Sequence, residues 1–452
     1  MKKILFLSLI FSMSLSLNAQ VFWSQEPTNF AAVSRGVADI SYGLTDPNVV
    51  WITVYDGVTT ANVIQEYGLS LDGGLTWTTG NINLGDPTLG IATINAINAT
   101  TAYVAAFTQT GGPGGGIWKT VNSGSTWTKQ SSAAYSDASS FTNVSTFFTS
   151  QDGFTMGDPA GGYFEIYTTQ NGGDLWTRVA SNSIITSLPG EYGTVRNIKR
   201  LGNDVWFGTN KGRLFHSANK GLTWTVGVTP LADTNTGAYA FSSSNNGILT
   251  DDGFNEWTTI NGGSTWVAAV PSGAIRDGGL CYVPGTTNSF VCLGVDGDVG
   301  TRGSSYSCDG GLNWTDINLI VGETNKVNGT GAINFASLTQ GLAAGFNDTT
   351  LRGIFKYTGT QIAECQPTFA TTSFSTSGYS IAPNPTNGLV ELKGTNINQV
   401  VVTDMLGKVV SNNTYSSLSN VTIDMTSYNT GIYFVKVTNN EGTVSTAKVV
   451  KQ

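Results

Sequence analysis

The stretch SLDGGLTW, Ser70–Trp77, decides the fold of this chain because similar octapeptides return along the sequence at regular spacing. The other copies are TVNSGSTW, TQNGGDLW, SANKGLTW, TINGGSTW and SCDGGLNW, which end at Trp127, Trp176, Trp224, Trp266 and Trp314. Successive tryptophans lie 42 to 50 residues apart. A repeat of this length that contains several short alternating stretches is typical of the blades of a β-propeller.

One repeat shows the four strands expected in each blade. It reads GTVRNIKRL, NDVWFGTN, GRLFHSAN and LTWTVG, between Gly193 and Gly227. Each stretch is short and alternates partly between apolar and polar residues, as β-strands do. The octapeptide therefore lies in the turn between the third and fourth strands. Its Ser or Thr and its Asp or Asn can bond the turn backbone, its Gly supplies a positive φ, and its Trp fills the space between blades.

These octapeptides resemble the Asp-box, or BNR repeat, SxDxGxTW, of sialidases, sortilin ectodomains, xyloglucanases and photosystem-assembly propellers. The Asp position holds Asp72 and Asp309 in two copies, and Asn122, Asn171, Asn219 and Asn261 in the other four. A carboxylate needed for chemistry would not be exchanged so freely for an amide. We therefore expect the boxes, with their tryptophans from Trp77 to Trp314, to be structural.

The chain also holds material for a seventh blade that lacks a box. The segments GAINFAS, GLAAGFN and RGIFKYTG, within residues 331–359, read as three strands. The missing fourth strand has a candidate in VFWSQEP, Val21–Pro27, whose Trp23 precedes Trp77 by about one repeat. Pairing of this N-terminal strand with the last blade would close the ring and remove exposed sheet edges. We expect an all-β chain with a seven-bladed propeller over residues 20–364.

The N-terminus and the composition indicate an exported protein that does not bind nucleic acid. MKKILFLSLIFSMSLSLNAQ has two lysines before an apolar run, which predicts a signal peptide over residues 1–19. No later stretch approaches the roughly 18 apolar residues of a membrane span. A net charge of -8 would repel a phosphate backbone. Cys281 and Cys292 flank a short turn, so they either form a disulfide or stay buried thiols.

The last residues predict a second domain. After a Thr- and Ser-rich linker, 365–378, residues 379–452 have the alternation of a small antiparallel Ig-like β-sandwich. They resemble the type A C-terminal sorting domain of the type IX secretion system of Bacteroidetes. The matching residues are Pro383, Asn384, Pro385, Gly388, Asp404, Gly407, Gly431 and Tyr433. The resemblance implies recognition of 379–452 by an outer-membrane translocon, and release or surface attachment. An ordinary adhesion or carbohydrate-binding module is the alternative.

The residue inventory argues against several kinds of active site. The single histidine, His216, follows a third strand beside a box and is expected to be inert, so neither a Ser-His-Asp triad nor a His-based metal cluster is predicted. The sialidase family carries an Arg-Ile-Pro segment near its start and an arginine triad. Here the early arginine, Arg35, lies in SRGVAD without that context, which disfavours a sialidase.

In a propeller, the loops between second and third strands share one face with the loops between blades, and ligands usually bind there. That face is predicted to carry a rim of Asp56, Asp251, Asp252, Asp296, Asp298 and Asp348. We expect any catalytic site at Asp158, Glu191 and Arg196 on the same face. Such a ring could bind Ca²⁺ or a polyhydroxylated ligand, or supply the paired carboxylates of a glycosidase. Asp-Gly is also favourable turn chemistry, and no other cofactor or metal is predicted.

Three functions remain open at this point. The leading one is a non-enzymatic secreted propeller that binds a glycan, a protein or an envelope component. The second is a glycoside hydrolase that acts on an extracellular polysaccharide through carboxylates at the channel mouth. The third is a propeller that assists assembly of an envelope complex.

Overall fold

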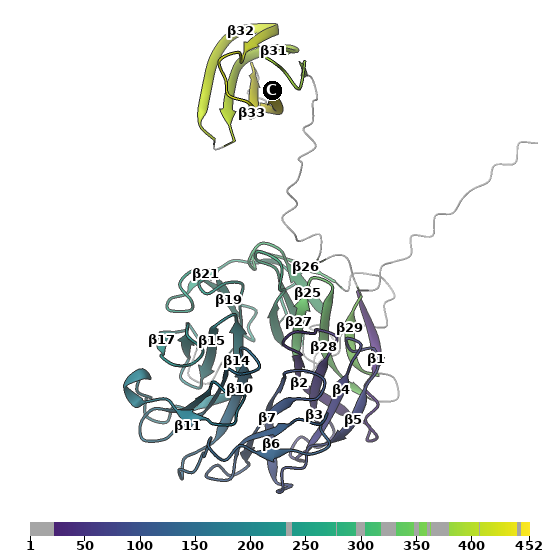
Figure 1. Cartoon of the computed structure of the whole chain (residues 1–452), viewed down its shortest axis with the longest axis vertical. Helices are drawn as coiled ribbons and strands as arrows, with labels where there is room; N and C mark the ends of the chain where they lie inside the picture. Colours follow the sequence, from purple (N-terminus) through teal and green to yellow (C-terminus); the bar gives the residue numbers. More distant parts are fainter. Residues whose placement is uncertain are drawn as a thin grey trace, which may run out of the picture. The chain divides into compact units, whose positions relative to one another are not determined.

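The computed structural model describes residues 22–231, 237–276, 278–294, 303–317, 331–347, 352–358, 362, 379–405, 407–440 and 444–452. The chain divides into two compact units, Met1–Gln366 and Pro367–Gln452. The first unit is a ring of antiparallel sheets around a central channel, and the second is a smaller all-β body (Figure 1). The predicted signal peptide and the predicted linker lie outside the described residues and stay predictions.

The first four blades each have four strands that follow one another from the channel outward, and the first blade is also joined to the seventh, because β2 pairs with β28. The first blade is β2 (Arg35–Tyr42), β3 (Val50–Asp56), β4 (Glu66–Ser70) and β5 (Thr78–Asn81). The second is β6 (Leu89–Ala96), β7 (Ala102–Thr108), β8 (Gly116–Thr120) and β9 (Thr128–Lys129). The third is β10 (Thr142–Phe147), β11 (Gly153–Pro159), β12 (Phe164–Thr169) and β13 (Thr177–Arg178), followed by the 3-10 helix η1 (Ser181–Ser183). The fourth is β14 (Gly193–Leu201), β15 (Asp204–Thr209), β16 (Arg213–Ser217) and β17 (Thr225–Val228).

The last three blades complete a seven-bladed ring, as predicted. The fifth is β18 (Ala238–Phe241), β19 (Gly247–Thr250), β20 (Glu256–Thr259) and β21 (Val267–Ala269). The sixth is β23 (Gly279–Tyr282), β24 (Phe290–Leu293), β25 (Ser304–Ser307) and β26 (Asn313–Asp316), with β22 (Ser272–Gly273) parallel to β26. The seventh is β27 (Ile333–Ser337), β28 (Gln340–Asn347), β29 (Arg352–Tyr357) and β1 (Trp23–Pro27).

The N-terminal strand β1 supplies the outer strand of the seventh blade. It pairs antiparallel with β29, from Trp23 opposite Tyr357 to Pro27 opposite Gly353. The Trp23 side chain is 1% exposed, and its indole N–H donates to Ser304 Oγ of the sixth blade at 2.8 Å. One side chain therefore joins the first strand of the ring to two neighbouring blades.

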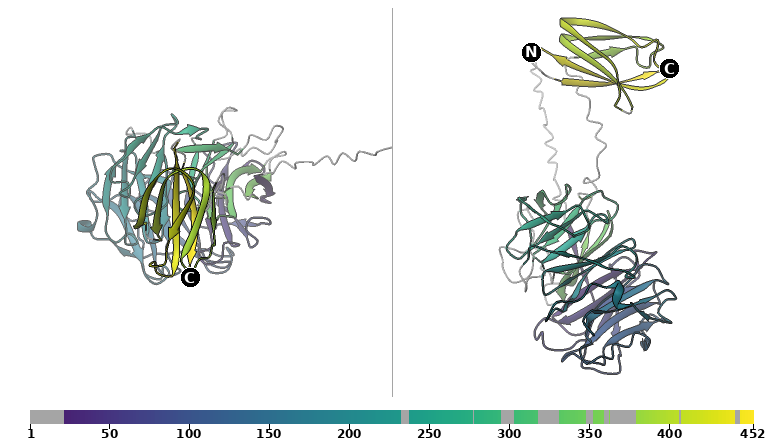
Figure 2. Two further views of the ribbon diagram at one scale, coloured as in Figure 1. Left: turned by 90° about the horizontal axis from the view of Figure 1, so that it is seen from above. Right: turned by 90° about the vertical axis from the view of Figure 1, so that its left-hand side faces the viewer.

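The box tryptophans fill the seams between blades, and Figure 2 shows the ribbon of the ring from two further sides. Trp127 of the second blade meets Trp51 of the first edge to face, with ring centroids 6.1 Å apart. Trp224 of the fourth blade lies 5.2 Å from Phe154 of the third. Each box tryptophan packs toward the preceding blade, so each copy of the repeat in the sequence corresponds to one interface between blades.

Each box is a self-bonded turn. Ser70 Oγ donates to Asp72 Oδ1 at 2.7 Å, and the backbone N–H groups of Leu75 and Thr76 donate to the same oxygen at 3.0 and 2.9 Å. Asn122 repeats the pattern, since its Oδ1 accepts from the Thr126 N–H at 2.9 Å. The amide and the carboxylate offer the same acceptor oxygen, which explains why they exchange between boxes.

Asp72 gives a direct test of the structural role of the boxes. Asp72→Ala should lower the free energy of unfolding by about 1–2 kcal/mol, because two backbone donors lose their acceptor. Asp72→Asn should cost less than about 0.5 kcal/mol, because Asn keeps the Oδ1 acceptor. Chemical denaturation of both variants measures the difference. Equal losses in the two variants would contradict the turn role.

Of the two alternatives left open for Cys281 and Cys292, a disulfide or buried thiols, the structure shows buried thiols. Both cysteines are free and buried. In the ladder between β23 and β24, Cys281 lies opposite Val291 and Cys292 lies opposite Leu280. Facing residues share one side of a sheet and adjacent residues alternate, so the two thiols point to opposite faces. Cys308 is disulfide-bonded.

The second unit is a β-sandwich-like domain. Its strands are β30 (Ser380–Ala382), β31 (Leu389–Asp404), β32 (Val409–Asp424), β33 (Gly431–Asn439) and β34 (Val444–Lys451). Its core includes Val390, Leu392, Val435 and Val449, all fully buried. Among the described residues of the whole chain, no helix is long and apolar enough to cross a membrane.

The predicted sorting-motif residues hold the turns and edges of this domain. Asn384, between Pro383 and Pro385, clamps β34: its Nδ2 donates to the Lys448 carbonyl at 2.7 Å and its Oδ1 accepts from the Val450 N–H at 2.9 Å. Gly407 has a φ of 81° in the turn closed by its N–H bond to the Asp404 carbonyl. The Gly388 carbonyl accepts from the Met425 N–H, and Gly431 starts β33, where the Tyr433 hydroxyl donates to the Asn429 carbonyl.

Candidate functional site

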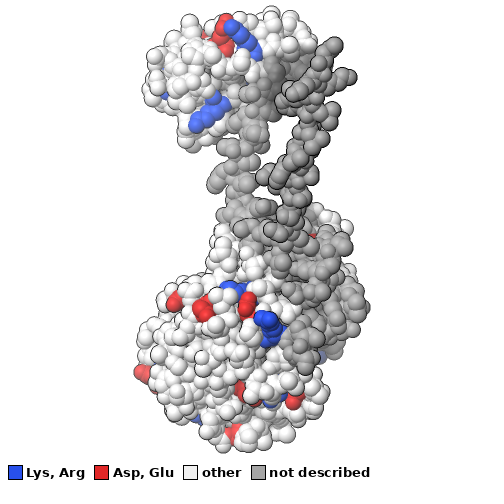
Figure 3. All heavy atoms as spheres, turned by 90° about the vertical axis from the view of Figure 1, so that its right-hand side faces the viewer, with Lys and Arg blue, Asp and Glu red and all other residues white. Residues whose placement is uncertain are grey.

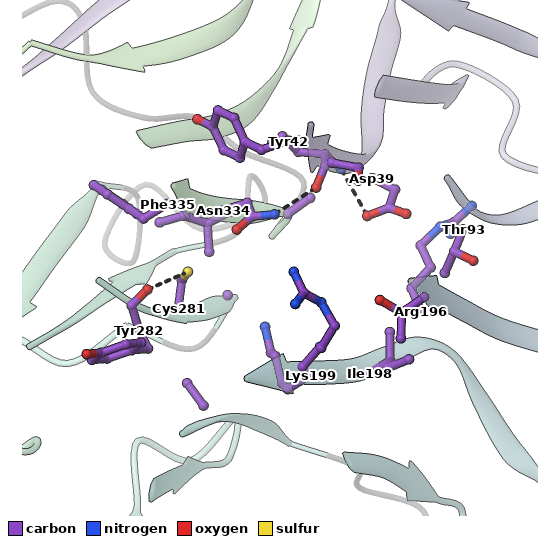
Figure 4. A pocket seen from close by; sticks show the side chains of 18 of the residues that line it. Asp39, Tyr42, Thr93, Arg196, Ile198, Lys199, Cys281, Tyr282, Asn334 and Phe335 are labelled. Atoms are coloured by element: carbon purple, nitrogen blue, oxygen red, sulfur yellow. Dashed lines mark hydrogen bonds between the residues drawn. The ribbon is translucent and has the colours of Figure 1, made fainter. Parts of the chain in front are cut away.

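The inner strands of all seven blades enclose a cavity of about 760 Å³ in the central channel. Among the described residues, its charged lining consists of the cations Arg196, Lys199 and Arg200, all on β14, and one carboxylate, Asp39 on β2. In Figure 4, Lys199 and Asp39 enter the cavity from opposite walls. On the face of the molecule drawn in Figure 3, charged side chains are scattered over a mainly uncharged surface. The cavity thus concentrates positive charge inside a protein whose net charge is -8.

The bulge in β14 places these cations. Gly193 pairs with Thr209 and Ile198 pairs with Phe207, so the register shifts between these two pairs and β14 carries extra residues there. Within that bulge Arg196 has a φ of 63°, a conformation that costs free energy for any residue except glycine. The bulge is fixed from both sides, since the Tyr239 hydroxyl donates to the Asn197 carbonyl and the Gly208 N–H donates to Asn197 Oδ1. Bulges of this kind re-aim side chains.

Two of these cations of the fourth blade reach across the channel to blades that are not adjacent to it. Arg196 donates to the Ile91 carbonyl of the second blade at 2.7 Å, and Lys199 Nζ donates to the Leu280 carbonyl of the sixth blade at 2.9 Å. Burial lowers the pKa of both groups, and the charge of Asp39 partly opposes this for each. Both groups are held by backbone oxygens and, among the described residues, neither forms an ion pair with a carboxylate.

Of the three cations, Arg200 has the fewest hydrogen-bond partners among the described residues. Desolvation lowers the pKa of its guanidinium, and no described residue forms a hydrogen bond or ion pair with its side chain. The side chains of Arg196 and Arg200 remain exposed to solvent although both lie deep within the protein, because they project into the cavity. Arg200 therefore presents free donors to whatever enters the channel.

The carboxylate Asp39 is occupied by the backbone of the neighbouring blade. Its Oδ2 accepts from the Ile94 N–H at 2.8 Å, and its Oδ1 accepts from the Ile40 N–H at 2.9 Å. Burial raises its pKa, and the two backbone bonds and the charges of Arg196 and Lys199 oppose this. Asp39 therefore links the first two blades and does not neutralise the cations by direct contact.

Asp158, predicted as a catalytic candidate, lies at the end of β11 with one oxygen occupied. Its Oδ1 accepts from Asn143 Nδ2 at 2.6 Å and from the Gly193 N–H at 3.0 Å. Burial raises the pKa of Asp158 to about 6, and these two hydrogen bonds oppose the shift. This environment suits a general acid, but a glycosidase needs a second carboxyl across the scissile bond.

Glu191, the predicted partner of Asp158, lies inside the protein. It is 5% exposed, and its Oε2 meets Arg213 at 2.8 Å. Its Oε1 accepts from the Thr209 hydroxyl at 2.7 Å, and the Leu188 N–H donates to Oε2. Removing a partner from a buried pair of this kind is costly, which is the mark of a structural contact. The third predicted residue, Arg196, lies in the channel instead of beside Glu191.

Two of the predicted rim aspartates close their own turns. Asp56 accepts from the N–H groups of Val58 and Thr59 and from Asn62, and these bonds lower its pKa to about 2. Asp251 accepts from the N–H groups of Gly253 and Asn255. Asp252 follows Asp251 in the same turn. Asp296, Asp298 and Asp348 lie outside the described residues.

His216 has a structural environment. Its Nε2 lies 2.6 Å from Asp204 Oδ1, and its ring stacks on Trp206 with centroids 4.5 Å apart. Among the described residues, no group of three or more His, Cys, Asp and Glu side chains is placed to hold a metal ion.

The sequence interpretation overlooked Lys199, Arg200 and Asp39 because it searched the loops of one face. These residues lie on innermost strands, where side chains line the channel. One signal was available: β14 carries three of the 22 Lys and Arg residues of the chain within nine positions.

Two family models match parts of the chain. Residues 110–278 match the family model "Photosynthesis system II assembly factor YCF48", and residues 380–452 match "Secretion system C-terminal sorting domain". No curated protein sequence matches the chain.

Solved structures share the propeller fold. A structure of YCF48 bound to D1 peptide has a TM-score of 0.53 at 16% identity, covering 75% of this chain and 97% of that one. YCF48 from Cyanidioschyzon merolae has a TM-score of 0.51 at 15% identity, covering 75% and 98%. The GH74 xyloglucanase from Xanthomonas campestris matches with a TM-score of 0.26 at 12% identity, covering 79% and 66%.

Proposed function

Because this chain joins a YCF48-like BNR propeller to a secretion-system sorting domain, we propose that it is an exported binding protein that holds its ligand in the propeller channel without cleaving it. The observation that carries the proposal is the cation cluster of β14. Arg196, Lys199 and Arg200 line a cavity of about 760 Å³ and, among the described residues, make no ion pair with a carboxylate. Ligand sites are concave spaces of this size with a few convergent polar groups.

The backbone of β14 supports a role in binding. A positive φ at an arginine and a bulge of the inner strand both cost stability, and such costs persist mainly at functional sites. The sorting domain indicates delivery to the outer surface or beyond, where an extracellular glycan, protein or envelope component is available. The YCF48 structure with D1 peptide makes a protein partner the competing ligand.

The alternative of a glycoside hydrolase has less support. Glu191 is committed to Arg213 and Thr209, which leaves Asp158 without its predicted partner. A hydrolase of this type needs two available carboxyl groups on either side of the bond.

Asp158→Asn in the full chain separates binding from hydrolysis. The variant keeps the Oδ1 acceptor for Asn143 and Gly193, so it should fold and should retard in polysaccharide affinity gels as the wild type does. Neither protein should release reducing ends from the same polysaccharides. Release of reducing ends by the wild type that is lost in Asp158→Asn would overturn the proposal in favour of a hydrolase.

A further inference from the structure

The channel holds a positive charge that the described part of the protein does not balance. Arg200 has no hydrogen-bond or ion-pair partner there, and Arg196 and Lys199 donate only to backbone carbonyls. The surrounding protein partly desolvates these cations, which lowers the pKa of all three groups although Arg196 and Arg200 keep contact with solvent in the cavity. An anionic group that enters the cavity would offset part of this desolvation through charge-assisted hydrogen bonds.

The inner strands of the second and third blades, β6 and β10, do not offer a free edge for an added peptide strand. The N–H of Ile94 is occupied by Asp39, that of Ala96 by Ser41 Oγ at 2.9 Å, and that of Ser145 by Thr93 Oγ1 at 3.0 Å. Strand addition depends on free backbone groups at a sheet edge, so these caps remove its main source of affinity. A ligand beside β6 and β10 is therefore bound through side chains.

Hydroxyl and amide side chains from three blades form part of the cavity lining. Thr93 Oγ1 and Asn95 Nδ2 lie 3.0 and 2.7 Å from Ser145 Oγ, and Asn334 Nδ2 donates to the Ile40 carbonyl at 3.0 Å. All four residues line the cavity. Hydroxyl groups both donate and accept, so they can exchange these bonds for bonds to the hydroxyl groups of a sugar.

We propose that the channel binds the carboxylate of an acidic sugar unit in an extracellular polysaccharide, with Arg200 and Lys199 contacting the carboxylate and Arg196 fixing the wall beside it. The inference rests on the proposed binding function and names the ligand class of that same site. It combines three observations: unpaired cations, capped inner edges and a hydroxyl-bearing wall.

Calorimetric titration of the full chain with polygalacturonate tests the inference. The wild type should bind polygalacturonate and should not bind the neutral polymer dextran. Arg200→Gln should weaken binding about ten- to a hundredfold, the loss expected for one charged hydrogen bond. Arg200→Lys should retain most of the affinity because it keeps the charge. The matched control is Arg352→Gln, which removes one exposed cation outside the cavity lining and should leave the affinity unchanged.

Three results would overturn the inference. Poly-L-glutamate that binds more tightly than polygalacturonate would assign the site to an acidic protein. Equal losses in Arg200→Gln and Arg352→Gln would show that binding depends on overall charge. If wild type and Arg200→Gln bind dextran equally well, the proposed binding function would stand, but the inference that the ligand is acidic would be wrong.

Discussion

Trp23→Ala is expected to lower the free energy of unfolding of the propeller by about 3–5 kcal/mol, the range for removal of a buried tryptophan. Trp23 is 1% exposed and packs against Phe335 and Tyr357 of the seventh blade. Its indole N–H bonds Ser304 Oγ of the sixth blade. The substitution opens a cavity where the ring of blades closes and removes the hydrogen bond between the first strand and the sixth blade. Denaturant unfolding followed by circular dichroism measures the loss.

Tyr192→Ala is the matched control, because Tyr192 is an aromatic residue with 53% exposure. Its effect should stay within about 0.5 kcal/mol. If Trp23→Ala unfolds at the same denaturant concentration as Tyr192→Ala, the packing of β1 does not contribute to the stability of the ring, even though β1 pairs with β29.

Glu256 should make the propeller less stable as the pH rises from about 4.5 to about 7. It is 1% exposed at the seam between the fifth and sixth blades, where its Oε2 accepts from the Trp314 indole at 3.0 Å. Burial raises the pKa of Glu256 to about 7, the Trp314 bond opposes the shift, and the charge of Asp309 adds to it. The folded state therefore holds its proton more tightly than the unfolded state. The stabilisation is complete below the unfolded pKa and is lost by about pH 7, a change of roughly 3 kcal/mol.

Glu256→Gln removes this titration and keeps an acceptor for Trp314. The difference in unfolding free energy between variant and wild type should therefore grow in favour of the variant between pH 5 and pH 8. Asp158 contributes a slope of the same sign, because its pKa is also raised, but it contributes equally to both proteins and cancels. Parallel stability curves for the two proteins would contradict a protonated Glu256 in the seam.

The blades could be predicted from the sequence because each box combines a local turn with a tryptophan that packs between two blades. Each copy needs a Ser or Thr, an Asp or Asn, a Gly and a Trp at fixed spacing, and the structure uses every one of them in the turn or between blades. Trp23 could be placed for the same reason, since it lies at the distance from Trp77 that the repeat requires. Asn384 and Gly407, which the sequence resemblance singled out, lie at a strand edge and in a turn of the second unit.

The site could not be predicted in the same way. The alternation of GTVRNIKRL indicates a strand but not the register shift that turns Arg196 into the channel. The burial of Glu191 depends on Arg213, which lies on another strand of the blade. The Asp-Gly turns suggested a rim of ligand-binding carboxylates. In the structure, the carboxylate oxygens of Asp56 and Asp251 accept hydrogen bonds from the backbone of their own turns. The positions of Arg196, Glu191 and these aspartates depend on contacts between strands and between blades, which a single sequence does not show.

Thermal unfolding of wild type and Arg200→Gln, with and without polygalacturonate, tests the central claim most directly. An unpaired cation held in the channel for a ligand costs stability when the channel is empty, so the unliganded variant should melt at a higher temperature than the wild type. Polygalacturonate should raise the melting temperature of the wild type and should leave that of the variant nearly unchanged. An unliganded variant that melts below the wild type, together with an equal shift on adding the polymer, would contradict the account.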